Sequence, residues 1–318
     1  FKQKTAYEIG VRLVGSEMCI RDRLQEGGLG RIQEDPSHGL HNHFKRNLIA
    51  TFPMEAIENP NGYHAWLYLL RASQLGHGIF QSNANDGQAF PFFYDDEYLE
   101  VVGKKNPENA EHPVWLLALY AAIIVRNQEA IDFLTTIDNE VFVNSNYGNQ
   151  LKPFDYALAD LLKGLFNPSA DLAHLLEQAY VTSNPDDYPI DEAYLYASRL
   201  KWPLVSIIEA IFTEDGEQAY NSAMEKALLL HKEYYSDEER SGSRSGGLAI
   251  PLIAMAVIAK EVKGFRTLLP LANSRRLKTA ERQMDLTAKG GRIYVNHARF
   301  YRIDVLESFG YVPSVNRR

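Results

Sequence analysis

The stretch that decides the fold is AYNSAMEKALLLHKEYY (219–235), followed by SDEERSGSRSGG (236–247) and LAIPLIAMAVIAKEVKG (248–264). The first segment repeats its apolar and amphipathic residues at spacings of four, three, four and three, which places them on one face of an α-helix: Tyr220, Met224, Ala227, His231 and Tyr234. The polar run that follows is rich in Ser and Gly and cannot continue this helix.

The third segment predicts a second, more deeply buried helix. Its apolar residues extend from Leu248 to Ala259, and Pro251 falls in the first turn, where a missing N–H does no harm. Gly264 stands where a C-terminal cap belongs, after two lysines in the last turn. The whole stretch therefore predicts a helical hairpin whose second helix is buried nearly all round.

Length and composition are those of a soluble globular protein. The chain has 318 residues, of which 45% are hydrophobic and 23% are charged, enough for a sizeable core. Its longest apolar runs, residues 114–125 and 248–259, are twelve residues each, whereas spanning a bilayer takes about 20. No stretch near the start combines a basic region, an apolar core and a cleavage site. We expect a cytoplasmic protein without a membrane partner.

The first 23 residues, FKQKTAYEIGVRLVGSEMCIRDR, require separate treatment. Their alternating apolar residues are typical of an edge strand. However, the whole string resembles the translated sequencing-adapter read-through found at the ends of metagenome-derived proteins, and we interpret residues 1–23 as a non-native artefact. The segment contains the single cysteine, Cys19, so no other thiol is present for disulfide, metal or nucleophile chemistry. Residues 24–318 are expected to form one all-α domain.

Apolar periodicity predicts a succession of helices along the rest of the chain. They are expected over residues 62–81, 113–125, 128–137, 153–166, 170–181, 190–200, 203–213 and 216–235. Ser169 is a candidate N-cap of the helix that follows it. The polar, Gly-rich residues 24–45 are interpreted as unstructured. PFFYDDEYLEVV (91–102) is expected to lead into a short helix, and alternation over 292–305 favours a small β-hairpin or a last helix.

Helices of this length joined by short loops favour one fold class. We expect an all-α helical bundle or an array of antiparallel helical hairpins, with a possible small β-hairpin near the C-terminus. No strict internal period indicates a repeat protein.

Charge is distributed unevenly along the chain. Residues 95–192 contain eighteen acidic and five basic residues, whereas residues 260–318 contain thirteen basic and five acidic ones. An acidic middle repels nucleic acid and attracts a basic protein. Our candidates for partner contact are two acidic clusters: Asp95, Asp96, Glu97, Asp186, Asp187, Asp191 and Glu192. The alternative is a solvated helix surface. The basic end lacks a recognisable binding module, so we expect no nucleic-acid partner.

A search for catalytic and metal-binding motifs favours a protein that is not an enzyme. P-loop, HExxH, CxxC and EF-hand spacings are missing. GSRSG (242–246) has Arg244 where a nucleophile elbow needs serine. His38, His41 and His43 lie in a polar segment without the pattern of a metal site. His231, on the apolar stripe, is expected to be a half-buried, hydrogen-bonded side chain. We predict no catalytic residues, no metal and no cofactor.

Two regions carry a resemblance to a known family. EKALLLHKEYYSDEERSGSRSGGLAIPLIAMAVIAKEVKGF (225–265) is similar to the signature region of a family of bacterial polymorphic-toxin immunity proteins, immunity protein family 49. HPVWLLALYAAIIVRNQEAIDFL (112–134) resembles the Trp-containing helix pair of that family. The positions that match are Trp115, Arg126, His231, Lys232, Tyr234, Tyr235, Gly246, Gly247, Leu248, Ala254, Ala256, Ala259 and Gly264, with Tyr311 and Pro313 near the end.

The resemblance implies an all-α, non-enzymatic protein that binds and neutralises a cognate toxin domain in the producing bacterium. Residues 266–298 depart from the family by being longer and more basic. Two other classes stay open. A helical scaffold that binds another protein or peptide would present a concave groove with exposed aromatic residues. A helical hydrolase would need Asp and His side chains that converge in one apolar pocket with shifted pKa values.

Overall fold

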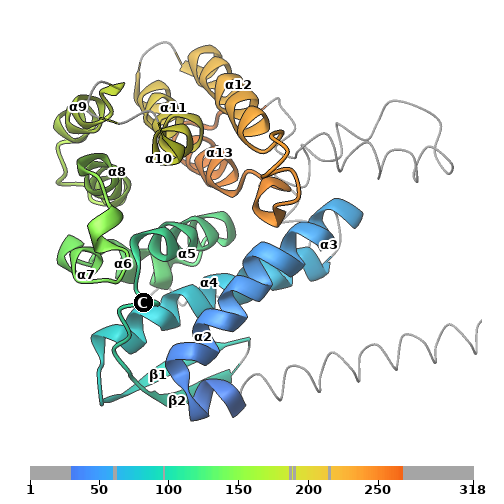
Figure 1. Cartoon of the computed structure of the whole chain (residues 1–318), viewed down its shortest axis with the longest axis vertical. Coiled ribbons are helices and arrows are strands. Elements are labelled where there is room, and N and C mark those ends of the chain that lie inside the picture. The colour runs from blue at the N-terminus through green and yellow to red at the C-terminus, as the bar shows by residue number, and fades with distance from the viewer. Residues whose placement is uncertain are drawn as a thin grey trace, which may run out of the picture.

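A computed structural model of the chain describes residues 30–59, 63–95, 97–185, 188, 191–213 and 216–267. The fold is mostly α, as predicted, with one two-stranded antiparallel hairpin in the described part (Figure 1). The α-helices are α2 (Pro36–Lys45), α3 (Phe52–Glu58), α4 (Tyr63–Ala84), α5 (His112–Val125), α6 (Gln128–Thr135), α7 (Asn139–Val143), α8 (Pro153–Gly164), α9 (Leu172–Thr182), α10 (Glu192–Tyr196), α11 (Trp202–Phe212), α12 (Gly216–Tyr234) and α13 (Ile250–Lys263).

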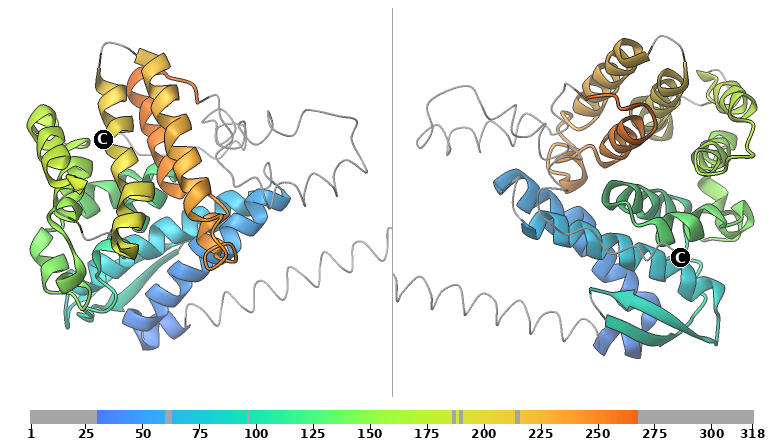
Figure 2. Two further views of the ribbon diagram at one scale, coloured as in Figure 1. Left: turned by 45° about the horizontal axis from the view of Figure 1, so that its top comes forward. Right: turned by 180° about the vertical axis from the view of Figure 1, so that it is seen from behind.

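Two groups of helices meet along α5, and α6 to α9 lie beside them (Figure 1). Helices α2, α3 and α4 lie on one side, and α10 to α13 lie on the other (Figures 1 and 2). Helix α5 packs against α4 in the first group and against α13 in the second. Both predicted core runs are confirmed, since α5 and α13 are buried along almost their whole length. Among the described residues, no helix is both long and apolar enough to span a membrane.

The predicted hairpin of α12 and α13 is correct in its helices but not in their pairing. Tyr220, Met224, Ala227 and His231 are buried on one face of α12, as the spacing predicts. That face packs mainly against α11, whereas α13 packs against α5 and α11 and has few contacts with α12. Because α13 is apolar on all sides, a single partner could not bury it. Gly264 ends α13 in the left-handed conformation, with φ of 72°.

Two long helices change their hydrogen-bonding pattern just before a proline. A π-helical segment, η1 (Arg46–Thr51), joins α2 to α3, and another, η4 (Ala197–Lys201), joins α10 to α11. Pro53 and Pro203 follow within two residues of these segments. Proline has no N–H to donate, so a wider turn allows the chain to continue as a helix past it.

The segment expected to lead into a short helix is a β-hairpin, and that prediction was wrong. Strand β1 (Ala89–Tyr94) pairs with β2 (Glu97–Val102), and Phe93 faces Tyr98 across the pair. Phe90, Phe92 and Tyr94 are buried at a spacing of two, which is the period of a strand. The acidic residues at the turn directly follow this alternation and are typical of a helix start, which is why the sequence predicted a helix there.

The prediction that the polar residues 24–45 are unstructured was also wrong for the described residues, which are mostly helical. Residues 30–34 are helical, and α2 buries Leu40 and Phe44 against α4. Gly39 lies within α2 and packs closely against Ile32. A Cβ at position 39 would lie 2.8 Å from the Cα of Ile32, so this contact requires glycine. The N-cap of α9 is Asp171, which accepts a hydrogen bond from the His174 amide, and not Ser169. The predictions for residues 1–23 and 292–305 lie outside the described residues.

Candidate functional site

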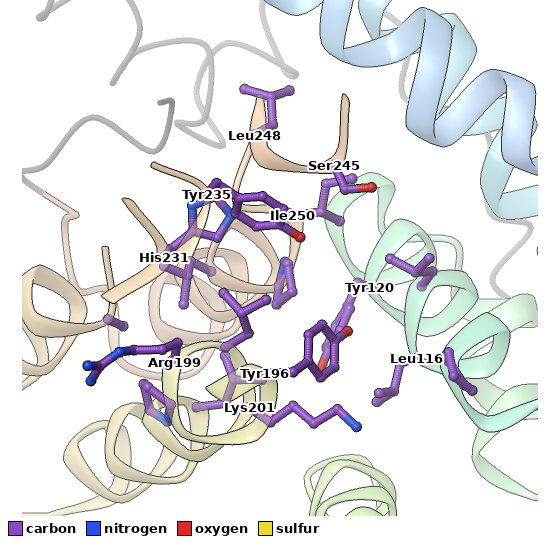
Figure 3. Close-up of a pocket in the computed structure, with 18 of the residues that line it drawn as sticks. Leu116, Tyr120, Tyr196, Arg199, Lys201, His231, Tyr235, Ser245, Leu248 and Ile250 are labelled. Carbon is purple, nitrogen blue, oxygen red and sulfur yellow. The ribbon is translucent and has the colours of Figure 1, made fainter. Parts of the chain in front are cut away.

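A pocket of about 260 Å³ opens between the two groups of helices (Figure 3). Its walls come from the start of α3, from α5, η4 and α11, from α12, and from residues 244–252. Most of the lining is apolar, and Leu116, Leu204, Ala227, Leu248 and Leu252 are buried side chains within it. A pocket of this kind, between helices of a bundle, is a usual place for a binding site.

Prolines shape this pocket. Pro53, Pro113, Pro203 and Pro251 all line it, and each lies in the first turn of its helix. Helices α5 and α13 begin at the pocket, and neither has a side chain that caps its first amides. Because the start of a helix carries a partial positive charge, these two helix starts favour negative charge nearby.

Three tyrosines from three different elements line the pocket: Tyr120 of α5, Tyr196 of α10 and Tyr235 just after α12. Tyr120 is 2% exposed, and its hydroxyl has no hydrogen-bond partner among the residues that the structure describes. Burial, and next the neighbouring Tyr196 hydroxyl, raise the pKa of Tyr120, and burial likewise raises the pKa of Tyr235. Both hydroxyls therefore remain protonated at neutral pH and can donate.

His231 lies beside Tyr235, with ring centroids 4.8 Å apart. Burial lowers the pKa of His231 to about 4, so the ring is neutral at pH 7. Gly246, in the 3-10 turn η5 (Arg244–Gly246), packs against the same tyrosine ring. A Cβ at Gly246 would lie 2.5 Å from Tyr235 Cγ, which makes glycine necessary for this contact.

The charged residues that line the pocket are all basic: Arg199, Lys201 and Arg244. The Lys201 ammonium lies 2.5 Å from the Asp155 carboxylate in a largely buried ion pair. Burial would raise the pKa of Asp155, but Lys201 and the Lys152 amide outweigh it and hold that pKa below its ordinary value. Arg199 pairs with Glu233 at 3.6 Å, and its guanidinium points away from the pocket (Figure 3). Arg244 is exposed.

The pocket does not have the arrangement expected of an Asp/His hydrolase. His231 is the histidine in its lining, and none of the lining residues is Asp or Glu. Elsewhere in the described chain, no group of three His, Cys, Asp or Glu side chains is placed to hold a metal ion. His38, His41 and His43 lie on α2, where His38 contacts Asp35 at 3.0 Å and His41 is buried. The chemistry that the pocket offers is apolar contact and hydrogen-bond donation.

The first acidic cluster lies at the turn of the β-hairpin. Arg71 donates two hydrogen bonds to the Asp95 carboxylate, and the Asp95 amide donates to the Gln74 side chain. Glu97 is exposed at the start of β2, whereas Asp96 lies outside the described residues. Asp95 is therefore part of the contact between the hairpin and α4, and of the two described acids in this cluster Glu97 is the exposed one.

The second acidic cluster lies at the start of α10. Asp191 is the N-cap of α10 and accepts a hydrogen bond from the Tyr194 amide. Glu192 accepts hydrogen bonds from Arg240 and from the Tyr234 hydroxyl. Asp186 and Asp187 lie outside the described residues. The β-hairpin lies on the side of α2 and α4, whereas α10 lies beside α11 to α13, so Glu97 and Asp191 belong to different parts of the molecule (Figures 1 and 2).

A family comparison identifies the chain. The model of the family described as Immunity protein 49 matches residues 61–268. The chain belongs to the Immunity protein 49 family. No curated protein and no solved structure matches it. The match runs from α4 to the end of α13 and includes most of the pocket lining, whereas the lining residues Ile49 and Pro53 precede the match.

The residues that carried the resemblance lie in the pocket, in the core and on the surface of the fold. His231 and Tyr235 line the pocket, and Gly247 is buried directly after η5. Trp115 is fully buried, and its Nε1 donates to the Leu134 carbonyl at 2.8 Å, which joins α5 to α6. Gly264 caps α13. Tyr234 contacts Glu192, and Lys232 is exposed.

Sequence reasoning missed Tyr120, Tyr196 and Lys201. One signal for Tyr120 was present, since it is the only hydroxyl-bearing residue in the apolar run 114–125. The four prolines near helix starts were a second signal. Neither signal indicates that these helix starts converge on one pocket, because that depends on tertiary packing.

Proposed function

We propose that this Immunity protein 49 family member binds a cognate polymorphic-toxin domain in the cytoplasm of the producing bacterium and neutralises it by direct contact. The observation that carries the proposal is the family match over residues 61–268. Immunity by contact requires a stable surface and a specific partner, and it requires no chemistry. A rigid array of helices with an open, partly apolar pocket suits that task.

We further propose that the toxin domain is basic. The chain carries a net charge of −8, and residues 95–192 alone have eighteen acidic and five basic residues, a net −13 that the rest of the chain partly offsets. Attraction between an acidic protein and a basic partner accelerates their encounter, and this acceleration decreases as salt screens the charges over about 10 Å at 0.1 M. A toxin that acts on nucleic acid needs a basic surface, and an acidic immunity protein competes for it.

The test is co-expression with the toxin domain encoded directly upstream. Cells that produce the toxin alone should stop growing, and cells that also produce this protein should grow. A catalytically inactive toxin domain should co-purify with the protein in a defined ratio, and its association rate should decrease as salt increases. Failure of the two purified proteins to bind would refute neutralisation by contact. Binding without growth would refute neutralisation while leaving contact intact.

The helical-scaffold alternative makes a different prediction for the same experiment. Its partner would be a protein or peptide unrelated to the toxin, so the toxin would neither bind nor be neutralised. The partly exposed Tyr196 and Tyr235 at the pocket are the aromatic residues that such a groove would present. Growth in the co-expression experiment separates the two classes.

A further inference from the structure

The pocket has a lining that suits an anion with an apolar body. Its walls are formed by buried aliphatic side chains, and its charged residues are Arg or Lys without Asp or Glu. This is unusual for a chain with a net charge of −8. At about 260 Å³ it is slightly smaller than the ~300–1,000 Å³ that is typical of small-molecule sites, so its guest is small.

The tyrosine hydroxyls give the second observation. Tyr120, Tyr196 and Tyr235 line the same pocket from three elements, as Figure 3 shows. The Tyr120 hydroxyl is buried and has no hydrogen-bond partner in the described chain. A buried donor without an acceptor is costly, and most native proteins avoid it. An oxygen atom of a guest would remove that cost.

A lysine and a helix start lie near the pocket tyrosines. The Lys201 ammonium lies 5.1 Å from the centre of the Tyr196 ring. Helix α5 begins at the pocket with Pro113 in its first turn, and no side chain caps it. The start of a helix and an ammonium group both favour a negatively charged guest. Lys201 is already paired with Asp155, so it contributes less than an unpaired lysine would.

We propose that this pocket binds a small apolar carboxylate, whose oxygens accept hydrogen bonds from Tyr120 and Tyr196 and whose hydrocarbon part packs against Leu204 and Ala227. Two sources share this chemistry. One is a free aliphatic or aromatic acid, and the other is an apolar segment of a bound polypeptide that carries a carboxylate. The proposal goes beyond the proposed function and does not depend on it, because it can be tested without any toxin.

The experiment is a calorimetric titration of the full chain with octanoate, 1-octanol and octylamine, which share one hydrocarbon tail. Octanoate should bind about tenfold more tightly than octanol, because a charge-assisted hydrogen bond is worth more than a neutral one. Octylamine should bind more weakly than octanol. Tyr120→Phe should weaken octanoate binding about tenfold and change octanol binding less than twofold. Tyr98→Phe, on the exposed hairpin, is the matched control and should leave all three affinities unchanged.

Equal affinities for the three probes would overturn the proposal, and so would octanoate binding that is the same in Tyr120→Phe and the unaltered protein. Tyr196→Phe provides a second test that does not perturb the core, because Tyr196 is partly exposed.

Competition with the inactive toxin domain identifies the source of the carboxylate. If saturating octanoate displaces the toxin, the carboxylate comes from the toxin; if both bind together, it comes from a free acid. Failure of the toxin to bind would affect only the proposed function.

Discussion

Arg71 and Asp95 form a two-point contact between α4 and the turn of the β-hairpin. The guanidinium donates from Nε and Nη2 to the two carboxylate oxygens, at 2.8 and 2.9 Å. Both side chains are largely shielded from solvent, with 14% and 18% of their surface exposed. Asp95 has a positive φ of 53°, a conformation that Asp and Asn tolerate better than most residues. The contact therefore fixes the direction of the hairpin on the helix.

Asp95→Asn should destabilise the protein by about 1 to 3 kcal/mol. The amide keeps the shape and the positive φ, but it leaves the Arg71 guanidinium without a charged partner in a partly buried site. Glu97→Gln, two residues along the chain and exposed, is the matched control and should change stability by less than about 0.5 kcal/mol. Urea unfolding of the two variants measures this difference. Equal midpoints would show that the ion pair contributes nothing.

The acidic surface of the hairpin should be tested at Glu97 and Glu100, which are both exposed. Replacing both with lysine should slow association with the toxin domain at low salt several-fold, because attraction becomes repulsion at that surface. The folded state should be nearly unaffected. Stopped-flow association at several salt concentrations measures the effect. An association rate that does not change would place the toxin contact elsewhere.

The sequence predicted most helices because their apolar periodicity is long and regular. The prediction was wrong at β1 and α2. Both elements are short, and the residues in or beside them are typical of another kind of structure. Three aromatic residues at a spacing of two were present in β1, but the adjacent acidic turn resembled a helix start. In α2, Gly39 and polar residues concealed a buried face that only the contact with α4 reveals.

The candidate site was less accessible to sequence reasoning than the fold. His231 and Tyr235 were noted, because they lie on or beside the stripe of one helix. Their neighbours Tyr120 and Tyr196 are far away in the sequence, and no local pattern relates them. Asp191 and Glu192 remain predicted partner contacts; both are exposed, and in the structure Asp191 also caps α10 and Glu192 pairs with Arg240. Composition alone cannot distinguish a carboxylate that is available to a partner from one that is already engaged.

Ala256→Leu should destabilise the protein by roughly 1 to 3 kcal/mol. Ala256 is buried on α13, which is surrounded by α5 and α11, so three additional carbon atoms would have to displace their neighbours. Val262→Leu is the matched control, because Val262 is 51% exposed near the end of the same helix. Chemical denaturation measures both variants. An unchanged midpoint for Ala256→Leu would mean that α13 is less tightly packed than the structure indicates.

Acid should destabilise the protein between pH 6.5 and 4 through buried histidines. Burial lowers the pKa of His77, His112 and His231 to about 4, whereas the ordinary value is 6.5. As pH falls through this window, these histidines bind protons in the unfolded chain but stay neutral in the folded chain. The free energy of unfolding therefore decreases. The loss should be about 1 to 2 kcal/mol per histidine between pH 7 and 5.

His77→Leu isolates one of these contributions, and urea midpoints at pH 7 and pH 5 measure it. The variant should lose less stability on acidification than the unaltered protein. His174→Ala is the control, because His174 is exposed and should leave the loss unchanged. Identical pH dependence in His77→Leu and the unaltered protein would contradict a buried, neutral His77.

Two buried tyrosines should respond in opposite directions to the loss of a hydroxyl group. The Tyr220 hydroxyl lies 2.5 Å from the Thr267 hydroxyl, so Tyr220→Phe removes a hydrogen bond and should destabilise the protein by about 0.5 to 1.5 kcal/mol. The Tyr120 hydroxyl is buried and has no partner in the described part of the chain, so Tyr120→Phe removes an unsatisfied donor and should stabilise the unliganded protein by about 1 kcal/mol. Both substitutions remove one oxygen from a buried ring, which makes each the control for the other. Thermal unfolding measures the two melting temperatures. If Tyr120→Phe is destabilised as much as Tyr220→Phe, the Tyr120 hydroxyl has a partner in the folded protein, and the pocket has no unsatisfied donor to offer a guest.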